Sequence, residues 1–356
     1  MFENIKKKTV IINRTNLLNN FKIIKKKAIN SKIAPVIKGD AYGHGIKECC
    51  QILLSSKVKS FYVARLEDAI KIRKIAKDIQ IIFLAGPVSK NCCNLIQSNK
   101  LIPVINNIDQ LKLFNDYVKQ SNFILHFDSG MNRLGFSSTD LLKSLPLINS
   151  KKVTMLMSHF SSADDMDLDE CNLQLQKLKK INKYFKVPLS ISNSAGIFLS
   201  KKFHLDFVRP GKSLYGVKPF NSNSFGLKQV MSVYAPIIQI SLIKKNQSIG
   251  YSRTFRSKKN IKTATIDIGY GDGLFRYGSN KINVYIDSFI CKVIGRISMD
   301  LIVIDITDIP ENKLYLGKPV EILGMNQTCE SLSKQISTNE HEVLISLGKN
   351  ANRIYY

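Results

Sequence analysis

Eight short apolar runs, each separated from the next by a helix-like segment, constrain the fold of the first two hundred residues most strongly. Short runs without strict polar–apolar alternation are typical of strands that are buried on both faces, as in a parallel sheet. Eight of them in this arrangement predict a (β/α)8 barrel, and a doubly wound sheet is the alternative. The runs are Ile33–Ile37, Ser60–Ala64, Ile79–Leu84, Leu101–Ile105, Phe123–Phe127, Val153–Met157, Val187–Ile191 and Leu205–Val208.

The residues that come directly after these runs are mostly polar. In barrel enzymes the chemistry lies at the C-terminal ends of the strands, so we expect these residues to line one mouth of the barrel. They are Lys38, Arg65, Gly86, Asn106, Asp128, His159, Ser192 and Arg209.

The pattern changes after about residue 225, where alternating and β-branched stretches are separated by glycine-rich turns. We therefore predict a barrel domain over residues 1–225 and a mostly β domain over residues 226–356, with the boundary at Asn221–Ser224. Thr9–Ile12 also has the character of a strand, and it is predicted to pair with the second domain. The strands predicted in the second domain are Ile237–Ile243, Ile261–Ile268, Ile282–Ile290 and Leu301–Thr307, followed by helices at Glu330–Ile336 and Glu340–Ser346.

Composition excludes several other classes of protein. The net charge of +26 comes mainly from lysines spread along the chain. No basic run is interleaved with stacking aromatic residues, which argues against specific nucleic-acid binding. The apolar runs are too short to span a bilayer, and the first residues lack a secretory signal, so we expect a cytoplasmic protein without a membrane segment. Seven cysteines without a C-x-x-C pair favour free thiols over disulfides or a metal site.

Lys38 is the strongest candidate for a catalytic residue. It follows the apolar run Ile33–Ile37, so its ammonium group loses hydration, which lowers the pKa of an amine and makes it nucleophilic. For an isolated lysine, a side chain that reaches solvent would be the better interpretation. The whole string K-G-D-A-Y-G-H-G, residues 38–45, resembles the lysine motif of the alanine racemases, a family that uses pyridoxal phosphate. The resemblance implies that Lys38 bonds to this cofactor and that Tyr42 contacts it.

Four more motifs of the barrel resemble the same family. H-F-S-S-A-D begins at His159, which is implied to stack on the cofactor ring, and ends at Asp164, which is implied to lie in a second layer around the site. S-N-S-A-G begins at Ser192, and small hydroxyl residues where a helix opens can bind an anion through free backbone N–H groups. The resemblance makes Ser192 a phosphate ligand.

The segment R-P-G-K-S-L-Y-G, residues 209–216, resembles a further family motif. Arg209 is the implied partner of the pyridine nitrogen. Because arginine keeps its proton, the ring nitrogen would stay unprotonated. Gly211 and the backbone of Lys212 are implied to complete the phosphate site, although the family usually has isoleucine at the position of Lys212.

G-M-N-R-L-G contains Arg133, which the resemblance places near the phenolic oxygen of the cofactor and the substrate carboxylate. In many relatives a carbamylated lysine of the preceding strand holds this arginine. The corresponding residue here is His126, which cannot form that stable carbamate. A bound anion or another carboxylate could orient Arg133 instead.

The second domain contains three motifs of the family, G-Y-S-R, G-Y-G-D-G and G-R-I-S-M-D. The first makes Tyr251 the implied second catalytic base, and Met299 is implied to touch substrate. In the family these residues enter the barrel mouth of the opposite subunit, which implies a head-to-tail homodimer. The residues implied to line the substrate entrance or a second layer are Tyr270, Arg276, Arg296 and Asp300.

The resemblance covers almost the full chain and implies interconversion of L-alanine and D-alanine, with D-alanine supplied for peptidoglycan. Two bases on opposite faces of Cα are required, and Lys38 and Tyr251 are the candidates. A racemase of broader range, acting on serine or basic amino acids, is the first alternative. A non-catalytic protein that binds pyridoxal phosphate is the second. The related decarboxylases are disfavoured because their H-x-G-S-G loop is absent from the sequence.

Overall fold

The computed structural model describes residues 5–220 and 225–356, which divide into two compact units. The barrel unit comprises Leu18–Ala41 and Ile46–Lys228. The C-terminal unit comprises Met1–Leu17, Tyr42–Gly45 and Gln229–Tyr356. The boundary predicted at Asn221–Ser224 lies outside the described residues. Each unit is considered by itself below.

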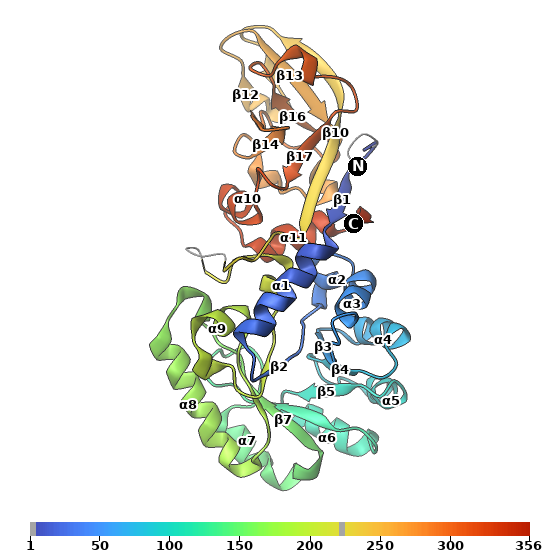
Figure 1. Ribbon diagram of the computed structural model, residues 1–356, viewed down its shortest axis with the longest axis vertical. Coiled ribbons are helices and arrows are strands. Elements are labelled where there is room, and N and C mark those ends of the chain that lie inside the picture. The colour runs from blue at the N-terminus through green and yellow to red at the C-terminus, as the bar shows by residue number, and fades with distance from the viewer. Residues whose placement is uncertain (1–4, 221–224) are drawn as a thin grey trace. The chain divides into compact units, whose positions relative to one another are not determined.

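The barrel unit is built on a parallel sheet in the order β2-β9-β8-β7-β6-β5-β4-β3 (Figure 1). The extension of β2 joins the two ends of this sheet, because the N–H of Ile37 donates to the carbonyl of Tyr62, 2.9 Å away, on β3. The predicted eight-stranded barrel is therefore confirmed. The strands are β2 (Lys32–Ile33), β3 (Ser60–Val63), β4 (Gln80–Phe83), β5 (Ile102–Ile105), β6 (Phe123–His126), β7 (Val153–Met157), β8 (Leu189–Ser190) and β9 (Phe207–Val208).

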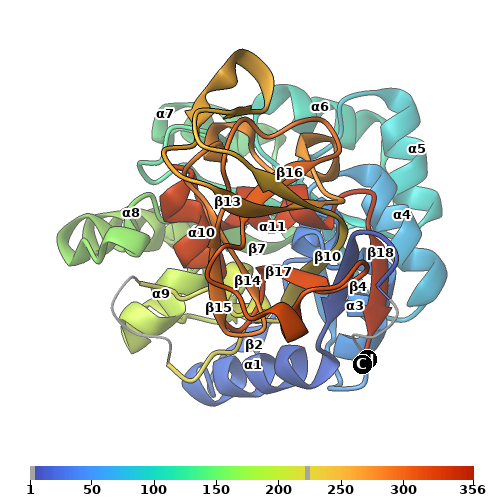
Figure 2. The same cartoon turned by 90° about the horizontal axis from the view of Figure 1, so that it is seen from above.

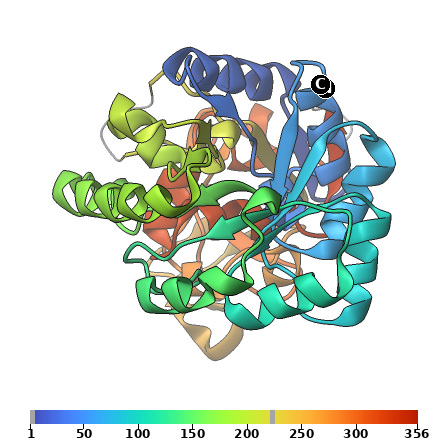
Figure 3. The same ribbon diagram turned by 90° about the horizontal axis from the view of Figure 1, so that it is seen from below.

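Helices surround this sheet on the outside (Figure 3). Several begin at a polar residue that caps the first turn; Asp167, for example, accepts a hydrogen bond from the N–H of Glu170 at the start of α8. Their buried faces pack toward the strands, which is why the chain alternates so regularly. The helices are α1 (Arg14–Lys27), α3 (Ile46–Leu54), α4 (Leu66–Ile75), α5 (Lys90–Ser98), α6 (Ile108–Tyr117), α7 (Ser138–Ser144), α8 (Leu168–Phe185) and α9 (Ser194–Leu199).

Large aromatic side chains fill the core of the barrel unit. Phe61, Tyr62 and Phe127 are fully buried on or beside its strands, and Phe114 packs edge-on against Phe123 with ring centroids 4.9 Å apart. Each such side chain contributes about 1.5–3 kcal/mol by leaving water. All seven cysteines are buried and none forms a disulfide in the described structure, so they act as small apolar side chains.

The C-terminal unit is organised around β10 (Met231–Ile243), the long strand that is yellow in Figure 1 and is also seen in Figure 2. It pairs antiparallel with β1 (Thr9–Ile12), β13 and β17. β1 pairs in addition with β18, in parallel. The other strands of this sheet are β13 (Ile261–Ile266), β14 (Asn283–Ile286), β15 (Phe289–Lys292), β16 (Ile302–Asp305), β17 (Pro319–Leu323) and β18 (Asn352–Tyr355), and the helices of the unit are α10 (Cys329–Gln335) and α11 (Glu340–Gly348).

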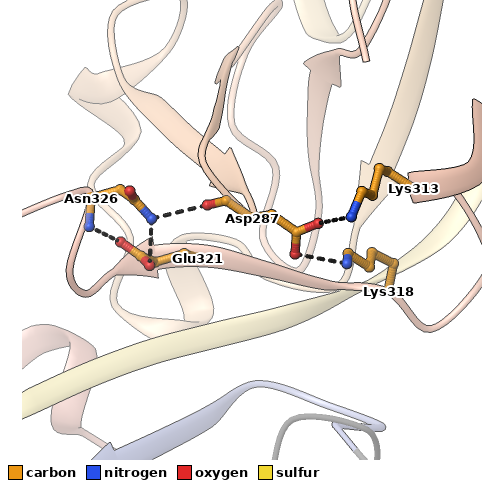
Figure 4. A network of polar contacts seen from close by, with 5 residues as sticks. All are labelled: Asp287, Lys313, Lys318, Glu321 and Asn326. Atoms are coloured by element: carbon orange, nitrogen blue, oxygen red, sulfur yellow. Dashed lines mark hydrogen bonds and ion pairs between the residues drawn. The ribbon is translucent and has the colours of Figure 1, made fainter. Parts of the chain in front are cut away.

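The single strand predicted at Ile282–Ile290 was wrong, because the chain reverses there and forms the β14–β15 hairpin. Asp287 sits in the turn with a left-handed φ of 51°, a conformation that a short polar side chain tolerates. Its carboxylate is 2.8 Å from Lys318 Nζ and 3.7 Å from Lys313 Nζ (Figure 4). On β17, Glu321 accepts hydrogen bonds from the backbone and side chain of Asn326. These contacts tie the hairpin turn to the neighbouring strand.

Every helix in the described part of the chain is too short or too polar to cross a membrane.

Candidate functional site

Lys38 lies at the start of an unusual left-handed turn. In α2 (Lys38–Tyr42), Gly39, Asp40 and Ala41 have φ between 54° and 62° and ψ between 45° and 49°. This conformation costs about 1–2 kcal/mol for each non-glycine residue, so other contacts must hold it. One of them is the carboxylate of Asp40, which accepts a hydrogen bond from the N–H of Ile46, 2.8 Å away. The turn thus fixes the backbone directly after the lysine.

The amine of Lys38 is only partly exposed, and the groups around it are cationic. Burial lowers its pKa, and the positive charges of Arg133 and Arg209 lower it further. All three cations lack a carboxylate ion-pair partner within the described ranges. A cluster of cations without a counter-charge suits a ligand that carries several negative charges, such as a phosphate ester with a carboxylate.

Arg209 is 4% exposed and is held by neutral oxygens at the end of β9. Its guanidinium donates to the hydroxyl of Ser190 and to the carbonyl of Ser158, each at 2.5 Å. It also lies over the ring of Tyr62, 5.8 Å from the centroid. Burial raises the pKa of the Tyr62 hydroxyl to about 12, so this tyrosine does not supply a negative charge at neutral pH.

His159 follows β7, and its Nδ1 lies 3.2 Å from a guanidinium nitrogen of Arg209. Because the guanidinium only donates, Nδ1 must be the acceptor, and the ring carries its proton on Nε2. Burial and then the charge of Arg209 hold the pKa of His159 well below its usual value. The sequence analysis named both residues, and the structure brings them into direct contact.

The segment after β8 and the turn after β9 lie side by side. The hydroxyl oxygen of Ser194 accepts hydrogen bonds from the N–H groups of Gly211 at 2.9 Å and Ser213 at 3.2 Å. The Ser213 hydroxyl is buried without a partner in the described structure. Ser192, the predicted phosphate ligand, instead donates its hydroxyl proton to the carbonyl of Phe203, 2.6 Å away. Its predicted role stays a prediction, but this geometry favours Ser194, which sequence reasoning missed.

Lys212 forms an ion pair with Asp164. The lysine side chain is 11% exposed and the aspartate 46% exposed, so the pair sits at the edge of the unit. It connects the turn that carries Gly211 with the 3-10 turn Ala163–Asp165, which follows the His159 motif. The side chain of Lys212 therefore has a partner of its own, while its backbone remains part of the turn.

His126 and Asn106 occupy the ends of neighbouring strands, β6 and β5. His126 Nδ1 is 2.8 Å from Asn106 Oδ1, and both side chains are buried. Burial, then the charge of Arg209, lowers the pKa of His126 to about 3; Arg133 also lowers it and Asp128 opposes the shift. Arg133 itself is exposed, on the loop that follows His126. Asn106 is one of the strand-end residues that the sequence pattern predicted at the mouth.

In the C-terminal unit, the three predicted motifs meet. Gly250, which precedes Tyr251, is packed so closely on the backbone of Arg296 that an added Cβ would lie 3.1 Å from its nitrogen. The N–H of Tyr270 donates to the carbonyl of Ser298, 3.0 Å away. Tyr251 is 67% exposed. The remaining predicted side chains of this cluster are also at least partly exposed: Tyr270, Arg276, Arg296, Met299 and Asp300.

Tyr42 is grouped with the C-terminal unit, where its ring centroid lies 5.6 Å from that of His341. The segment that follows it is fixed by the end of the chain. Arg353 donates to the carbonyl of Gly43 at 3.1 Å, and the Tyr355 hydroxyl donates to that of His44 at 2.9 Å. A role for Tyr42 at the cofactor remains a prediction. Among the described residues, there is no group of three or more His, Cys, Asp or Glu side chains placed to hold a metal ion.

The residues around Lys38 and the motifs of the C-terminal unit are matched by family models. Residues 12–219 match the alanine racemase N-terminal domain, and residues 230–355 match the alanine racemase C-terminal domain. The chain belongs to the alanine racemase family. An alanine racemase of Rickettsia canadensis is 35% identical, and the match covers 98% of each chain.

Solved structures of alanine racemases have the same fold. The structure from Bartonella henselae, described with covalently bound pyridoxal phosphate, has a TM-score of 0.92 at 31% identity and covers 98% of this chain and 99% of that chain. The structure from Acinetobacter baumannii has a TM-score of 0.90 at 31% identity, with the same coverage. The predicted family, the barrel and the mostly β second domain are thus confirmed.

Proposed function

We propose that this chain is a pyridoxal-phosphate-dependent alanine racemase that interconverts L-alanine and D-alanine. The observation that carries the proposal is Lys38, an amine of lowered pKa beside Arg133 and Arg209, in a chain of the alanine racemase family. An amine that is less protonated at neutral pH can act as a nucleophile and as a base. The surrounding cations favour an anionic cofactor and an amino acid carboxylate.

The residues of the barrel unit suit pyridoxal phosphate. Lys38 would hold it covalently, and Ser194 with the turn at Gly211 and Lys212 would hold its phosphate. The two hydroxyls of Ser194 and Ser213 favour this assignment, because neither donates its proton to a described residue. Arg209 keeps further guanidinium protons for the pyridine nitrogen. When bound, the cofactor supplies an electron-accepting ring that spreads the negative charge left on Cα after proton loss.

The protein must remove a proton from one face of Cα and return it to the other. We assign Lys38 to the face of the D-antipode and Tyr251 to the face of the L-antipode. His159 holds a hydrogen-bond donor at Nε2, because Arg209 occupies its Nδ1, and so it can contact the phenolic oxygen of a base such as Tyr251. Arg133 would bind the substrate carboxylate.

The position of Tyr251 supports a homodimer. It is a highly exposed aromatic residue on a turn between the short strands β11 (Ser248–Ile249) and β12 (Phe255–Arg256). Met299, on the adjacent loop, is 56% exposed. Exposed aromatic and apolar side chains gathered on one loop cluster are typical of an interface. We infer that these side chains enter the barrel mouth of a second copy.

The activity is tested by incubating the protein with L-alanine and pyridoxal phosphate in heavy water, and following deuterium at Cα together with chirality. We expect deuterated D-alanine, and none with the Lys38→Ala variant. If the cofactor binds but alanine does not exchange, the same assay with serine and with lysine distinguishes a broader racemase from a non-catalytic binding protein.

The two-base assignment needs its own experiment. The Tyr251→Phe variant should lose conversion of L-alanine to D-alanine more severely than Cα exchange from D-alanine, because Lys38 still serves that face. Equal losses in both exchange assays would contradict the assignment. The supply of D-alanine for peptidoglycan and a cytoplasmic location stay predictions, which growth of a depleted strain on D-alanine and cell fractionation would test.

A further inference from the structure

His126 and Asn106 form a buried hydrogen-bonded pair whose function the proposed reaction leaves open. The two side chains come from adjacent parallel strands, and His126 Nδ1 is 2.8 Å from Asn106 Oδ1. His126 is 8% exposed and Asn106 is 1% exposed. A buried polar pair with defined geometry at the C-terminal ends of barrel strands lies where active-site residues are found.

The surroundings of Asn106 fix the tautomer of the histidine. Its amide nitrogen has only acceptors around it: the carbonyls of Leu84 at 3.1 Å, Ala85 at 3.3 Å and Val104 at 3.1 Å. The side-chain oxygen of Gln110 adds a fourth, at 3.1 Å. Because the amide nitrogen must face these oxygens, Oδ1 is the atom that faces His126. Oδ1 can only accept, so the imidazole proton is on Nδ1.

The charges that face the ring keep it neutral. Arg209 approaches from the end of β9, Arg133 and Asp128 from the loop after β6, and burial acts in the same direction as the two arginines. Of these groups only Asp128 favours a proton on the ring, and its carboxylate already accepts hydrogen bonds from the N–H groups of Gly130 and Met131. A neutral ring with its proton on Nδ1 has a lone pair on Nε2.

The Cδ2 edge of the ring faces the loop that carries Arg133. The N–H of Phe136 donates to the carbonyl of His126 at 2.8 Å, which holds the end of this loop against β6. At Gly135, where φ is 112°, an added Cβ would lie 3.2 Å from His126 Cδ2, the carbon bonded to Nε2. Arg133 is two residues earlier on the same loop.

We propose that His126 is a positioning residue for Arg133: once the site is loaded, the exposed guanidinium turns to donate a hydrogen bond to the bare Nε2 of the imidazole. Asn106 fixes the ring from the other side. The ends of β5 and β6 thereby hold His126 in place, and His126 in turn orients Arg133 on the loop. A neutral acceptor orients Arg133 without adding a negative charge beside it. The full charge of Arg133 then remains available to an anionic ligand, and the amine of Lys38 gains no carboxylate neighbour that would favour its protonated form.

The tautomer can be read directly by nitrogen NMR of the full chain, labelled with ¹⁵N-histidine and loaded with pyridoxal phosphate. The chain has five histidines, and the spectrum of a His126→Gln variant identifies the signals of His126. We expect a proton on Nδ1 and none on Nε2, unchanged between pH 8 and pH 5. A protonated Nε2, or a titration near the ordinary histidine pKa, would overturn the proposal.

The contact with Arg133 is tested by two matched variants. His126→Gln keeps a neutral acceptor, whereas His126→Leu has similar volume without one. The Nε–H signal of Arg133 is assigned by its loss in Arg133→Lys. Its chemical shift should change in the leucine variant and stay largely the same in the glutamine variant. Loss of a hydrogen bond to a charged group weakens binding by about 10- to 100-fold. We therefore expect the KM for alanine to rise by this factor in His126→Leu and not in His126→Gln.

An Arg133 signal that is unchanged in His126→Leu would refute the contact. The catalytic consequence rests on the proposed racemase function, but the two NMR readouts do not. If alanine is not turned over and the NMR signals behave as expected, the proposed function fails while the positioning role of His126 stands.

Discussion

The low pKa of His126 makes a quantitative prediction about acid stability. In the unfolded chain the pKa of a histidine is near its ordinary value of 6.5, whereas in the folded protein the pKa of His126 is about 3. Between these two values the unfolded state binds more protons than the folded state, so stability rises with pH and is lost as the solution is acidified. At pH 5 this group alone should destabilise the fold by about 2 kcal/mol relative to pH 8.

The assay compares the wild-type chain with His126→Gln, which cannot titrate in this range. Urea unfolding without added cofactor, followed by circular dichroism at pH 8 and pH 5, gives the free energy of unfolding for each protein. The wild type should lose about 2 kcal/mol more than the variant between the two pH values. His159, whose pKa is also lowered, acts in the same direction in both proteins and largely cancels.

Equal losses in the two proteins would refute the reasoning, because they would mean that the fold does not hold His126 in its neutral form. A larger loss in the variant would mean that the site favours the imidazolium, which would require a carboxylate partner that outweighs the two arginines.

Three further predictions concern the cofactor site. Ser194→Ala should weaken pyridoxal-phosphate binding by about tenfold in a spectroscopic titration, because it removes a buried hydroxyl donor. A smaller loss of affinity in Ser194→Ala than in Ser192→Ala would instead favour Ser192 as the phosphate ligand. Gly196→Ala should impair cofactor binding, since its Cβ would lie 2.9 Å from the ring of Phe160; unchanged affinity would contradict this crowding. Lys212→Ile should lower the free energy of unfolding by no more than about 1 kcal/mol, because the partner Asp164 is half exposed, and this loss should shrink at high salt. A large, salt-independent loss in thermal denaturation would contradict this prediction.

Most of the fold was predictable because burial on both faces leaves a direct trace in the sequence. All eight barrel runs overlap strands, although β2, β8 and β9 are shorter than predicted, and the helices α10 and α11 lie where they were expected. The β14–β15 hairpin was missed because its turn, at Asp287, lacks the glycine that usually marks a reversal. β17 was missed as well, although Pro319–Leu323 is a short, mostly apolar run. Its signal was obscured by the irregular loop that precedes it.

The site was predictable only at the level of segments. Ser192 and Ser194 belong to one motif, and nothing in the sequence says which hydroxyl faces the turn at Gly211 and which faces the carbonyl of Phe203. That choice depends on where α9 begins relative to the next strand. Asn106 carried a signal, as a polar residue after an apolar run, but its link to His126 arises from the register of β5 and β6.

The two histidines of the barrel show why such pairings decide the chemistry. Both rings are neutral, yet their protons are on opposite nitrogens. Arg209 donates to Nδ1 of His159, which leaves a donor at Nε2. Asn106 accepts from Nδ1 of His126, which leaves an acceptor at Nε2. A donor suits the phenolic oxygen of a catalytic base, and an acceptor suits a guanidinium. The same side chain thus serves two opposite needs within one site, and the partner on its far nitrogen determines which. A residue type in a motif cannot specify this difference, because the partner comes from a different strand.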